Sequence, residues 1–231
     1  VQLKLNDDGF YTLMIGCSDM GTGCDTILAQ MAADGLGCDM DNIIVRGVDT
    51  DQSPYDSGSY ASSTTYVTGG AVVKACESMR KRICEEAAAI MGLKSGEVDF
   101  DGETISENDN PEHSMTLSDL ITSLEAGNGR IIEVTESHTS PVSPPPFMAG
   151  AAEIEVDLET GKITPINYVA AVDCGTVINT NLARIQTEGG IVQGMGMTLY
   201  EDVQYTEAGK MKNRNFMSYK IPTRLDMGSI S

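Results

Sequence analysis

Tryptophan is absent from the chain, and aromatic residues make up only 5% of its 231 residues. Basic residues are also scarce, because 15 Lys and Arg stand against 34 Asp and Glu and give a formal net charge of -19. Proteins that bind nucleic acid need positive charge for the phosphate backbone and aromatic rings for base stacking. The composition therefore argues against a nucleic-acid partner.

Histidines and paired cysteines, the usual metal ligands, are scarce too. The histidines are His113 and His138, and no two of the six cysteines form a C-x-x-C pair, so the spacing predicts no metal site. We expect both histidines to be solvated or to cap an element. Free thiols are typical of a reducing compartment, and no apolar run approaches the roughly 20 residues of a membrane span. We therefore expect a cytoplasmic chain without a membrane partner.

Two runs rich in glycine or hydroxyl residues stand just before predicted amphipathic helices. Met20-Gly21-Thr22-Gly23 precedes a helix predicted over Thr26–Leu36, and Ala61-Ser62-Ser63-Thr64-Thr65 precedes a longer helix over about Thr65–Met91. Each run offers unpaired backbone N–H groups to an anion, and the second run adds hydroxyl donors. The alternative is that the glycines only turn the chain and the hydroxyls only cap the helices.

Several blocks in a fixed order carry a family resemblance. They are Asp19–Thr26, Asp49–Asp51, Gly58–Thr65 with Gly69–Val72, Val172–Asn179, Gln186–Gly196 and Tyr219–Thr223. In this order the chain resembles the C-terminal side of the molybdenum-binding large subunit of the xanthine dehydrogenase and aldehyde oxidoreductase family of molybdenum hydroxylases. The blocks extend over almost the whole chain, and they are more specific together than any single glycine motif.

The resemblance implies a set of residues that bind the cofactor. They are Met20, Gly21, Thr22, Gly23, Ala61, Ser62, Ser63, Thr64 and Gln186. The family's first run is usually Met-Gly-Gln-Gly, so Thr22 departs from it and keeps one hydroxyl with less reach. The family's Ala-Ser-x-Ser run contacts the pterin and its phosphate, and Thr64 preserves the last hydroxyl. A family glutamine near the metal's oxo ligand or the pterin edge matches Gln186.

The resemblance also implies the activity of the whole enzyme. Enzymes of this family hydroxylate an N-heterocycle or an aldehyde with water, using molybdenum on a molybdopterin, with the cytosine dinucleotide form as one candidate. A 2Fe-2S cluster and FAD are expected on partner chains or domains. The family's catalytic base is a glutamate of a Gly-Glu motif downstream of the segment that matches Tyr219–Pro222. The chain ends at Ser231 before such a motif.

We therefore expect a fragment that contains no catalytic residue and is inactive alone, completed by the remaining segments of the molybdenum chain and by iron–sulfur and flavin subunits. A naturally split enzyme is one alternative. A non-catalytic binding or assembly module that reuses the scaffold is another.

The pattern predicts an α+β fold with two subdomains. Residues 1–138 would carry the cofactor loops, 139–146 would form a proline-rich connector, and 147–231 would hold a hairpin and a glycine-rich helix. The remaining predicted elements are strands at Tyr11–Ile15, Asn42–Val48, Glu97–Phe100, Ile131–Glu136, Ala152–Leu158 and Ile163–Val172, and helices at Met115–Leu124 and Leu182–Leu199. We expect the acidic stretch Asp99–Glu112 to be a solvated loop.

Several residues allow two interpretations. Asp49, Asp51 and Asp56 resemble a metal site, but a solvated turn is favoured. Cys24 follows the glycine turn, where a helix N-terminus could acidify its thiol, although packing is favoured. Cys76 is expected in the core.

The predicted glycine-rich helix also leaves alternatives open. Its glycines would admit either the cofactor or a tightly packed neighbour. Gln186 could instead cap the start of this helix. Glu188 is expected to order the backbone around Gln186 rather than to transfer protons.

Overall fold

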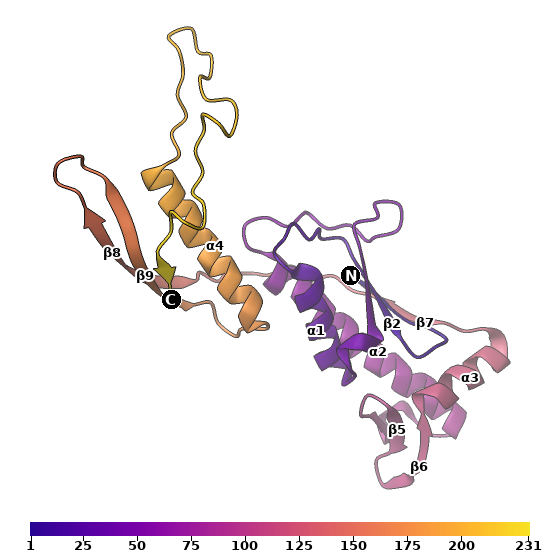
Figure 1. The fold of residues 1–231 in the computed structure, drawn as a ribbon. Helices are drawn as coiled ribbons and strands as arrows, with labels where there is room; N and C mark the ends of the chain where they lie inside the picture. The colour runs from indigo at the N-terminus through magenta and orange to yellow at the C-terminus, as the bar shows by residue number, and fades with distance from the viewer. The chain divides into compact units, whose positions relative to one another are not determined.

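The structure is a computed structural model that describes residues 1–231 apart from the side chain of residue 128. It contains four α-helices and three small sheets, so the predicted α+β class is confirmed (Figure 1). The chain divides into two units, Val1–Ser143 and Pro144–Ser231. None of the helices in the described part of the chain is long and apolar enough to cross a membrane.

Unit 1 is built on a four-stranded sheet in the order β3-β2-β1-β7. Its strands are β1 (Gln2–Leu5), β2 (Tyr11–Ile15), β3 (Ile43–Gly47) and β7 (Ile132–Thr135). Strand β1 is antiparallel to both β2 and β7, whereas β2 and β3 are parallel. Alternate residues of β1 and β2 are buried, as expected for a sheet with one face on the core.

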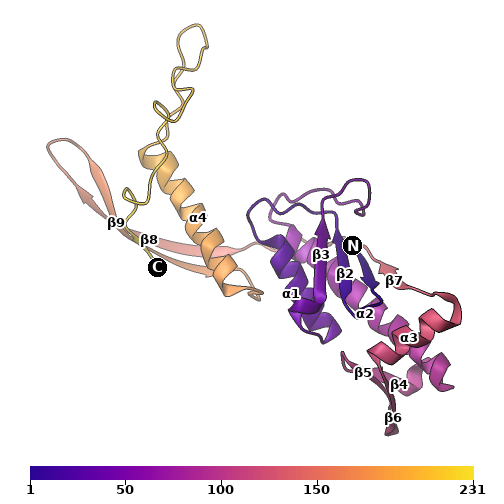
Figure 2. The same ribbon diagram turned by 45° about the vertical axis from the view of Figure 1, so that its right-hand side comes forward.

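Two helices pack against this sheet. Helix α1 (Cys24–Leu36) packs against β3, and the long helix α2 (Thr64–Met91) packs against β1 and β7 (Figure 2). Both helices end at a glycine in the left-handed conformation, Gly37 with φ 76° and Gly92 with φ 75°. The fully buried side chains at this interface include Leu3, Leu13, Leu28, Val72, Met79 and Ile83.

A second small sheet corrects the prediction of a solvated loop over Asp99–Glu112. This segment contributes to the antiparallel strands β4 (Val98–Phe100), β5 (Thr104–Glu107) and β6 (Asn110–Thr116). Phe100 and Ile105 are fully buried, so this polar stretch contains apolar residues that face the core between exposed polar ones.

Helix α3 (Leu117–Asn128) follows β6 and begins later than the predicted Met115. Thr116 caps it, since its Oγ1 accepts a hydrogen bond from the backbone N–H of Asp119 at 3.1 Å. Short 3-10 helices at Met40–Asn42 and Ser95–Glu97 precede β3 and β4.

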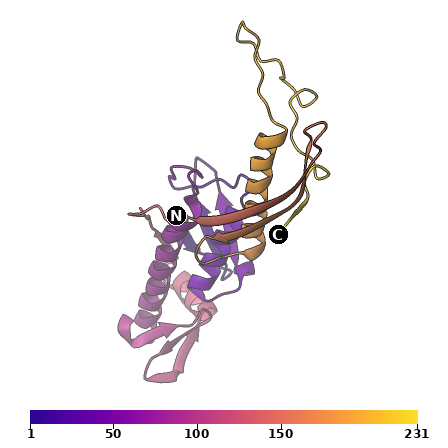
Figure 3. The ribbon, with the colours of Figure 1, turned by 90° about the vertical axis from the view of Figure 1, so that its left-hand side faces the viewer.

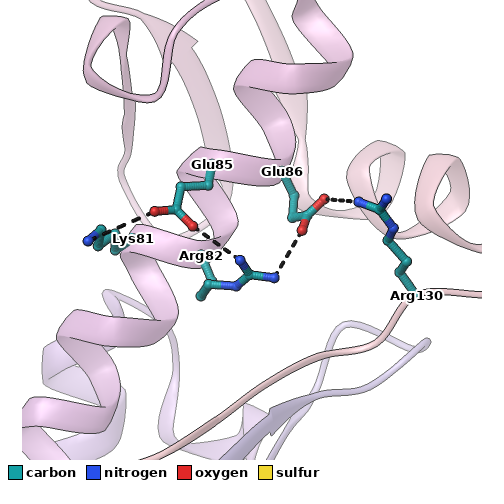
Figure 4. A network of polar contacts seen from close by, with 5 residues as sticks. All are labelled: Lys81, Arg82, Glu85, Glu86 and Arg130. Carbon is teal, nitrogen blue, oxygen red and sulfur yellow. Dashed lines mark hydrogen bonds and ion pairs between the residues drawn. The ribbon is translucent and has the colours of Figure 1, made fainter.

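An ion-pair network connects α2 to the segment that follows α3 (Figure 4). The Glu86 carboxylate accepts hydrogen bonds from Arg82 at 3.1 Å and from Arg130 at 3.2 Å. Arg82 also pairs with Glu85 at 3.2 Å, and Lys81 reaches Glu85 at 3.9 Å. Glu86 keeps only 13% of its side chain exposed, so it is the most enclosed member of the network.

Unit 2 consists of a long hairpin, one helix and a short edge strand. Strands β8 (Phe147–Val156) and β9 (Ile163–Asp173) are antiparallel, and β10 (Ser229–Ile230) pairs in parallel with β9. Helix α4 (Thr180–Leu199) lies beside the hairpin (Figure 3). Many apolar side chains of the hairpin stay exposed, among them Met148 at 53% and Val169 at 49%.

Candidate functional site

The two predicted runs lie at the same end of the unit 1 sheet. Because β2 and β3 are parallel, the segments that leave their carboxyl ends begin at the same edge. The first segment leads through Met20–Gly23 into α1, and the second leads through Ala61–Ser63 into α2. A hydrogen bond from Ser59 Oγ to the Ser18 carbonyl at 2.8 Å joins the two segments.

Helices α1 and α2 run in the same direction. A Cβ atom added to Gly69 would lie 2.7 Å from Met31 Cε, and one added to Gly35 would lie 2.9 Å from Cys76 Cβ. Residues early in α1 therefore meet residues early in α2, and later residues meet later ones. Both N-termini, with their partial positive charge, lie at the end of the sheet that carries the two runs.

The first run is a turn that its own acidic neighbour holds. Gly21 and Gly23 adopt φ of 98° and 78°, which only glycine adopts readily. Asp19 Oδ1 accepts hydrogen bonds from their N–H groups at 2.8 and 3.2 Å, and these bonds lower the pKa of Asp19 below its usual range. The prediction that both runs offer unpaired N–H groups is therefore wrong at Gly21 and Gly23. The side chain of Met20 is 65% exposed at this turn.

The second run is open. Ala61 and Ser62 both have positive φ, 52° and 54°, which is rare for residues other than glycine and is typical of functional loops. Ser63 stands at the N-cap of α2 but makes no side-chain capping bond, and its hydroxyl is oriented toward the Tyr60 carbonyl, to which it donates at 2.7 Å. The Ser63 N–H donates to the Tyr60 carbonyl at 3.1 Å, and the first turn of α2, which no side chain caps, keeps unpaired N–H groups for an anion.

A buried polar layer supports the two runs. The buried Thr68 hydroxyl donates to Asp56 Oδ2 at 3.1 Å, and the Cys24 thiol donates to Asp25 Oδ1 at 3.6 Å. Cys24 is 2% exposed, and burial raises the pKa of its thiol to about 12. The packing interpretation of Cys24 is therefore correct, and Cys76, 1% exposed, lies in the core as predicted.

The acidic turn does not assemble a metal site. Asp49 accepts a hydrogen bond from the N–H of Asp51 at 3.0 Å, and Asp56 accepts one from the N–H of Gly58 at 2.8 Å, as in ordinary turns. Among the described side chains, the one group of metal-ligand type is Asp19, Cys24 and Asp25. The Asp19 carboxylate already accepts backbone hydrogen bonds from Gly21 and Gly23, and Cys24 is only 2% exposed.

His138 corrects the expectation of a solvated or capping histidine. Its Nδ1 is buried without a hydrogen-bond partner, and a Cβ added to Gly70 would lie 2.9 Å from its Cγ. The ring therefore packs on the first turns of α2. His113 is exposed on β6 and pairs with Glu107 at 2.9 Å.

Gln186 lies in unit 2, on the exposed surface of α4. It lines a largely apolar groove of about 670 Å³ between α4 and the hairpin, together with Tyr168 and Gly190. The alternative that Gln186 caps the helix is wrong, since Asn179 performs this role by accepting from the Leu182 N–H at 3.0 Å. That Gln186 approaches the two runs of unit 1 stays a prediction.

The neighbours of Gln186 also differ from expectation. Glu188 pairs with Arg184 at 2.6 Å along the helix. It makes an ordinary ion pair on the helix surface rather than a bond to the backbone around Gln186.

The glycines of α4 fall into two groups. A Cβ added to Gly189, Gly190 or Gly194 would meet no atom within 4 Å. A Cβ at Gly196 would lie 3.0 Å from Pro222 Cδ. Tight packing therefore explains Gly196 but none of the other three.

Comparison with known proteins places this geometry in a family. The model of the molybdopterin cofactor-binding domain matches residues 1–228. The probable hypoxanthine oxidase XdhD of Escherichia coli is 31% identical over 221 residues, which are 95% of this chain and 23% of that protein. The nicotine 6-hydroxylase large subunit of Paenarthrobacter nicotinovorans is 29% identical over 96% of this chain and 28% of its own.

The fold is shared with solved structures as well. Quinoline 2-oxidoreductase from Pseudomonas putida 86 matches with a TM-score of 0.85 and 27% identity, over 99% of this chain and 30% of its own. The chain thus spans less than a third of the length of each of these relatives. Fold and sequence agree that the chain belongs to the molybdopterin cofactor-binding domain family, as part of a molybdenum hydroxylase molybdenum-binding subunit.

Proposed function

We propose that the two runs of unit 1 hold the molybdopterin cofactor of a molybdenum hydroxylase. The observation that carries the proposal is the open N-terminus of α2, where Ala61 and Ser62 are left-handed and Ser63 leaves the first turn uncapped. This donor set fits a phosphate group, because an anion there is stabilised by backbone N–H groups and by the helix dipole.

The other predicted residues would surround the remaining parts of the cofactor. Met20 and Thr22 are exposed at the first turn, and the Thr22 hydroxyl makes no hydrogen bond within the described chain. Thr64 offers a hydroxyl at the start of α2. Gln186 would contribute an amide that donates and accepts at once, which suits a pterin edge. When bound, the cofactor supplies the redox and oxygen-transfer chemistry at molybdenum.

The whole enzyme would hydroxylate an N-heterocycle or an aldehyde with water as the oxygen source. Support comes from relatives named as a hypoxanthine oxidase and a nicotine hydroxylase. We propose that further segments of the molybdenum chain cover the exposed hairpin of unit 2, and that 2Fe-2S and FAD partners receive the electrons. The cytosine dinucleotide form of the cofactor and a cytoplasmic location belong to the same proposal, the latter because all six cysteines are free.

The test is cofactor content in the enzyme that contains this chain, produced in a host that makes molybdopterin. Ser62→Ala should lower molybdenum and pterin content roughly tenfold at limiting cofactor, since a hydroxyl bonded to a charged group contributes about 1.5–3 kcal/mol. Ser118→Ala is the matched control, because Ser118 is an exposed serine in the first turn of α3. Equal cofactor content in both variants would argue against the proposal. A stable complex without any cofactor would favour the assembly module.

A further inference from the structure

Residues 210–224 carry positive charge in an otherwise acidic chain. They hold five basic residues and no Asp or Glu, although the whole chain has a formal net charge of -19. The basic residues are Lys210, Lys212, Arg214, Lys220 and Arg224, and all five are exposed. None of them takes part in an ion pair within the described part of the chain. Unpaired charges of one sign on one segment attract an anionic partner.

The first three basic residues form a row on extended backbone beyond the C-terminal end of α4 (Figure 1). Tyr205 and Met211 form an antiparallel bridge there. Alternate residues of extended backbone face the same side, and Met211 is half-buried whereas Lys210, Lys212 and Arg214 are exposed. The three side chains therefore follow one another at intervals of roughly 6.6 Å, twice the rise per residue of a strand.

The acidic residues at the base of this hairpin have other partners. Glu201 Oε2 accepts a hydrogen bond from the Tyr219 hydroxyl at 2.7 Å, and Asp202 Oδ2 accepts one from the Gln204 side chain at 2.8 Å. The Asn213 side chain is 7% exposed, accepts from the Gln204 N–H at 3.0 Å and donates to the Asp202 carbonyl. These bonds fix the backbone that carries the row, so a partner would not have to order it.

A mostly apolar cavity of about 300 Å³ adjoins the row. Its lining includes Val203, Met211, Phe216 and Tyr219, and Arg214 belongs both to the cavity and to the row. The Phe216 side chain is 79% exposed, so this apolar surface is open to a partner. A ligand that pairs with the row can therefore place an apolar group beside Arg214 in the cavity.

We propose that this segment is a docking surface for an extended acidic segment of a partner protein. Carboxylates at every second position of an extended peptide repeat at the same interval as the row. A nucleic acid fits less well, because a long polyanion would also meet the negative charge of the rest of the chain, whereas a short peptide stays within about 8 Å of the basic residues. The surface shares no residue with the proposed cofactor site.

The test is fluorescence polarisation of the full chain with a labelled peptide of alternating Glu and Thr residues that ends in Phe. The native chain should bind it at low salt. Lys212→Gln combined with Arg214→Gln should weaken binding roughly three- to twentyfold, because each exposed ion pair contributes a factor of about 1.4 to 5. Lys162→Gln combined with Arg184→Gln is the matched control, since it removes the same charge from two other exposed positions of unit 2 and should leave the affinity unchanged.

Two further measurements separate specific docking from general attraction. A peptide with Gln in place of every Glu should not bind. Phe216→Ser should weaken binding of the peptide that ends in Phe and not of one that ends in Thr. Failure of the Glu peptide to bind, or equal affinity of the two double variants, would overturn the proposal. Tighter binding of a single-stranded DNA of the same charge would overturn it as well and would assign the surface to nucleic acid.

Discussion

Replacing Gly190 by alanine in α4 should stabilise the helix. Glycine in a helix interior is destabilising by about 0.5–1 kcal/mol relative to alanine because it loses more backbone freedom on folding. A Cβ at Gly190 would meet no atom within 4 Å, so no clash offsets this gain. The gain corresponds to a roughly two- to fivefold increase in the hydrogen-exchange protection of the α4 amides.

Gly196→Ala is the matched variant in the same helix. Its Cβ would lie 3.0 Å from Pro222 Cδ and would also collide with Glu201, so protection should fall. Hydrogen exchange measured by mass spectrometry on the full chain follows both variants. If Gly190→Ala lowered the hydrogen-exchange protection of the α4 amides as Gly196→Ala should, no open space for a side chain could exist at Gly190 in unit 2, and the reasoning would be refuted.

The same substitution then separates stability from function. In the complete enzyme, Gly190→Ala should lower molybdenum content if the cofactor or another segment approaches the backbone at this position. A normal molybdenum content together with a stabilised α4 would mean that neither the cofactor nor another segment approaches the backbone at Gly190.

Three further predictions concern unit 1 and the thiols. Glu86→Gln should lower the free energy of unfolding by about 1 kcal/mol in urea titrations, because the enclosed Glu86 carboxylate accepts from both Arg82 and Arg130, whereas Glu85→Gln should cost less since the Glu85 side chain is itself more exposed, 34% against 13%. Hydrogen bonds lower the pKa of Asp101 and Asp119 below the 3.8 of an unperturbed aspartate, so the stabilisation they give is present above that value and is lost as the pH falls through the lower folded-state pKa. Acid titration of the melting temperature checks this, and a loss already complete near neutral pH would contradict it. Thiol alkylation of the native chain should modify exposed Cys174 first and leave Cys24 unmodified, as mass spectrometry of the peptides would show, because Cys24 is buried and its pKa is raised to about 12.

Periodicity predicted the elements whose sequence carries one clear pattern. Strand β2 has the predicted bounds Tyr11–Ile15, and α2 starts one residue before the predicted Thr65. Both have apolar residues at regular spacing, so their buried face can be read locally. β1 and β10 were missed because each is short, and a short apolar run does not separate strand from loop.

The acidic segment 99–112 shows where composition misleads. Its charge suggested solvent, yet Phe100 and Ile105 are buried on neighbouring strands. The turn between the strands is closed by Asp101, which accepts from the N–H groups of Glu103 at 2.9 Å and Thr104 at 2.8 Å. Acidic residues here form the turn as well as the exposed face of the strands, so their number alone does not distinguish a sheet from a solvated loop.

The candidate site could be predicted in position but not in detail. The positions of the two runs follow from glycine, hydroxyl and helix patterns. The occupation of the first run by Asp19 depends on a turn conformation that many sequences could adopt. The packing of the His138 ring on α2 depends on Gly70, which is far from it in the chain and admits the ring only because it lacks a side chain. Such contacts follow from tertiary packing and have no local signal.

The local charges also explain how so acidic a chain can hold an anionic cofactor. A net charge of -19 acts through solvent and is screened over about 8 Å at physiological salt, whereas N–H groups act at hydrogen-bond distance. What matters is therefore the first turn of each helix. Asp25 lies in the first turn of α1, and the first turn of α2 holds no acidic residue. If net charge governed binding, adding a carboxylate at Thr65 would change phosphate affinity no more than adding one on distant α3. If local geometry governs it, Thr65→Glu should abolish phosphate binding while Ser118→Glu leaves it unchanged.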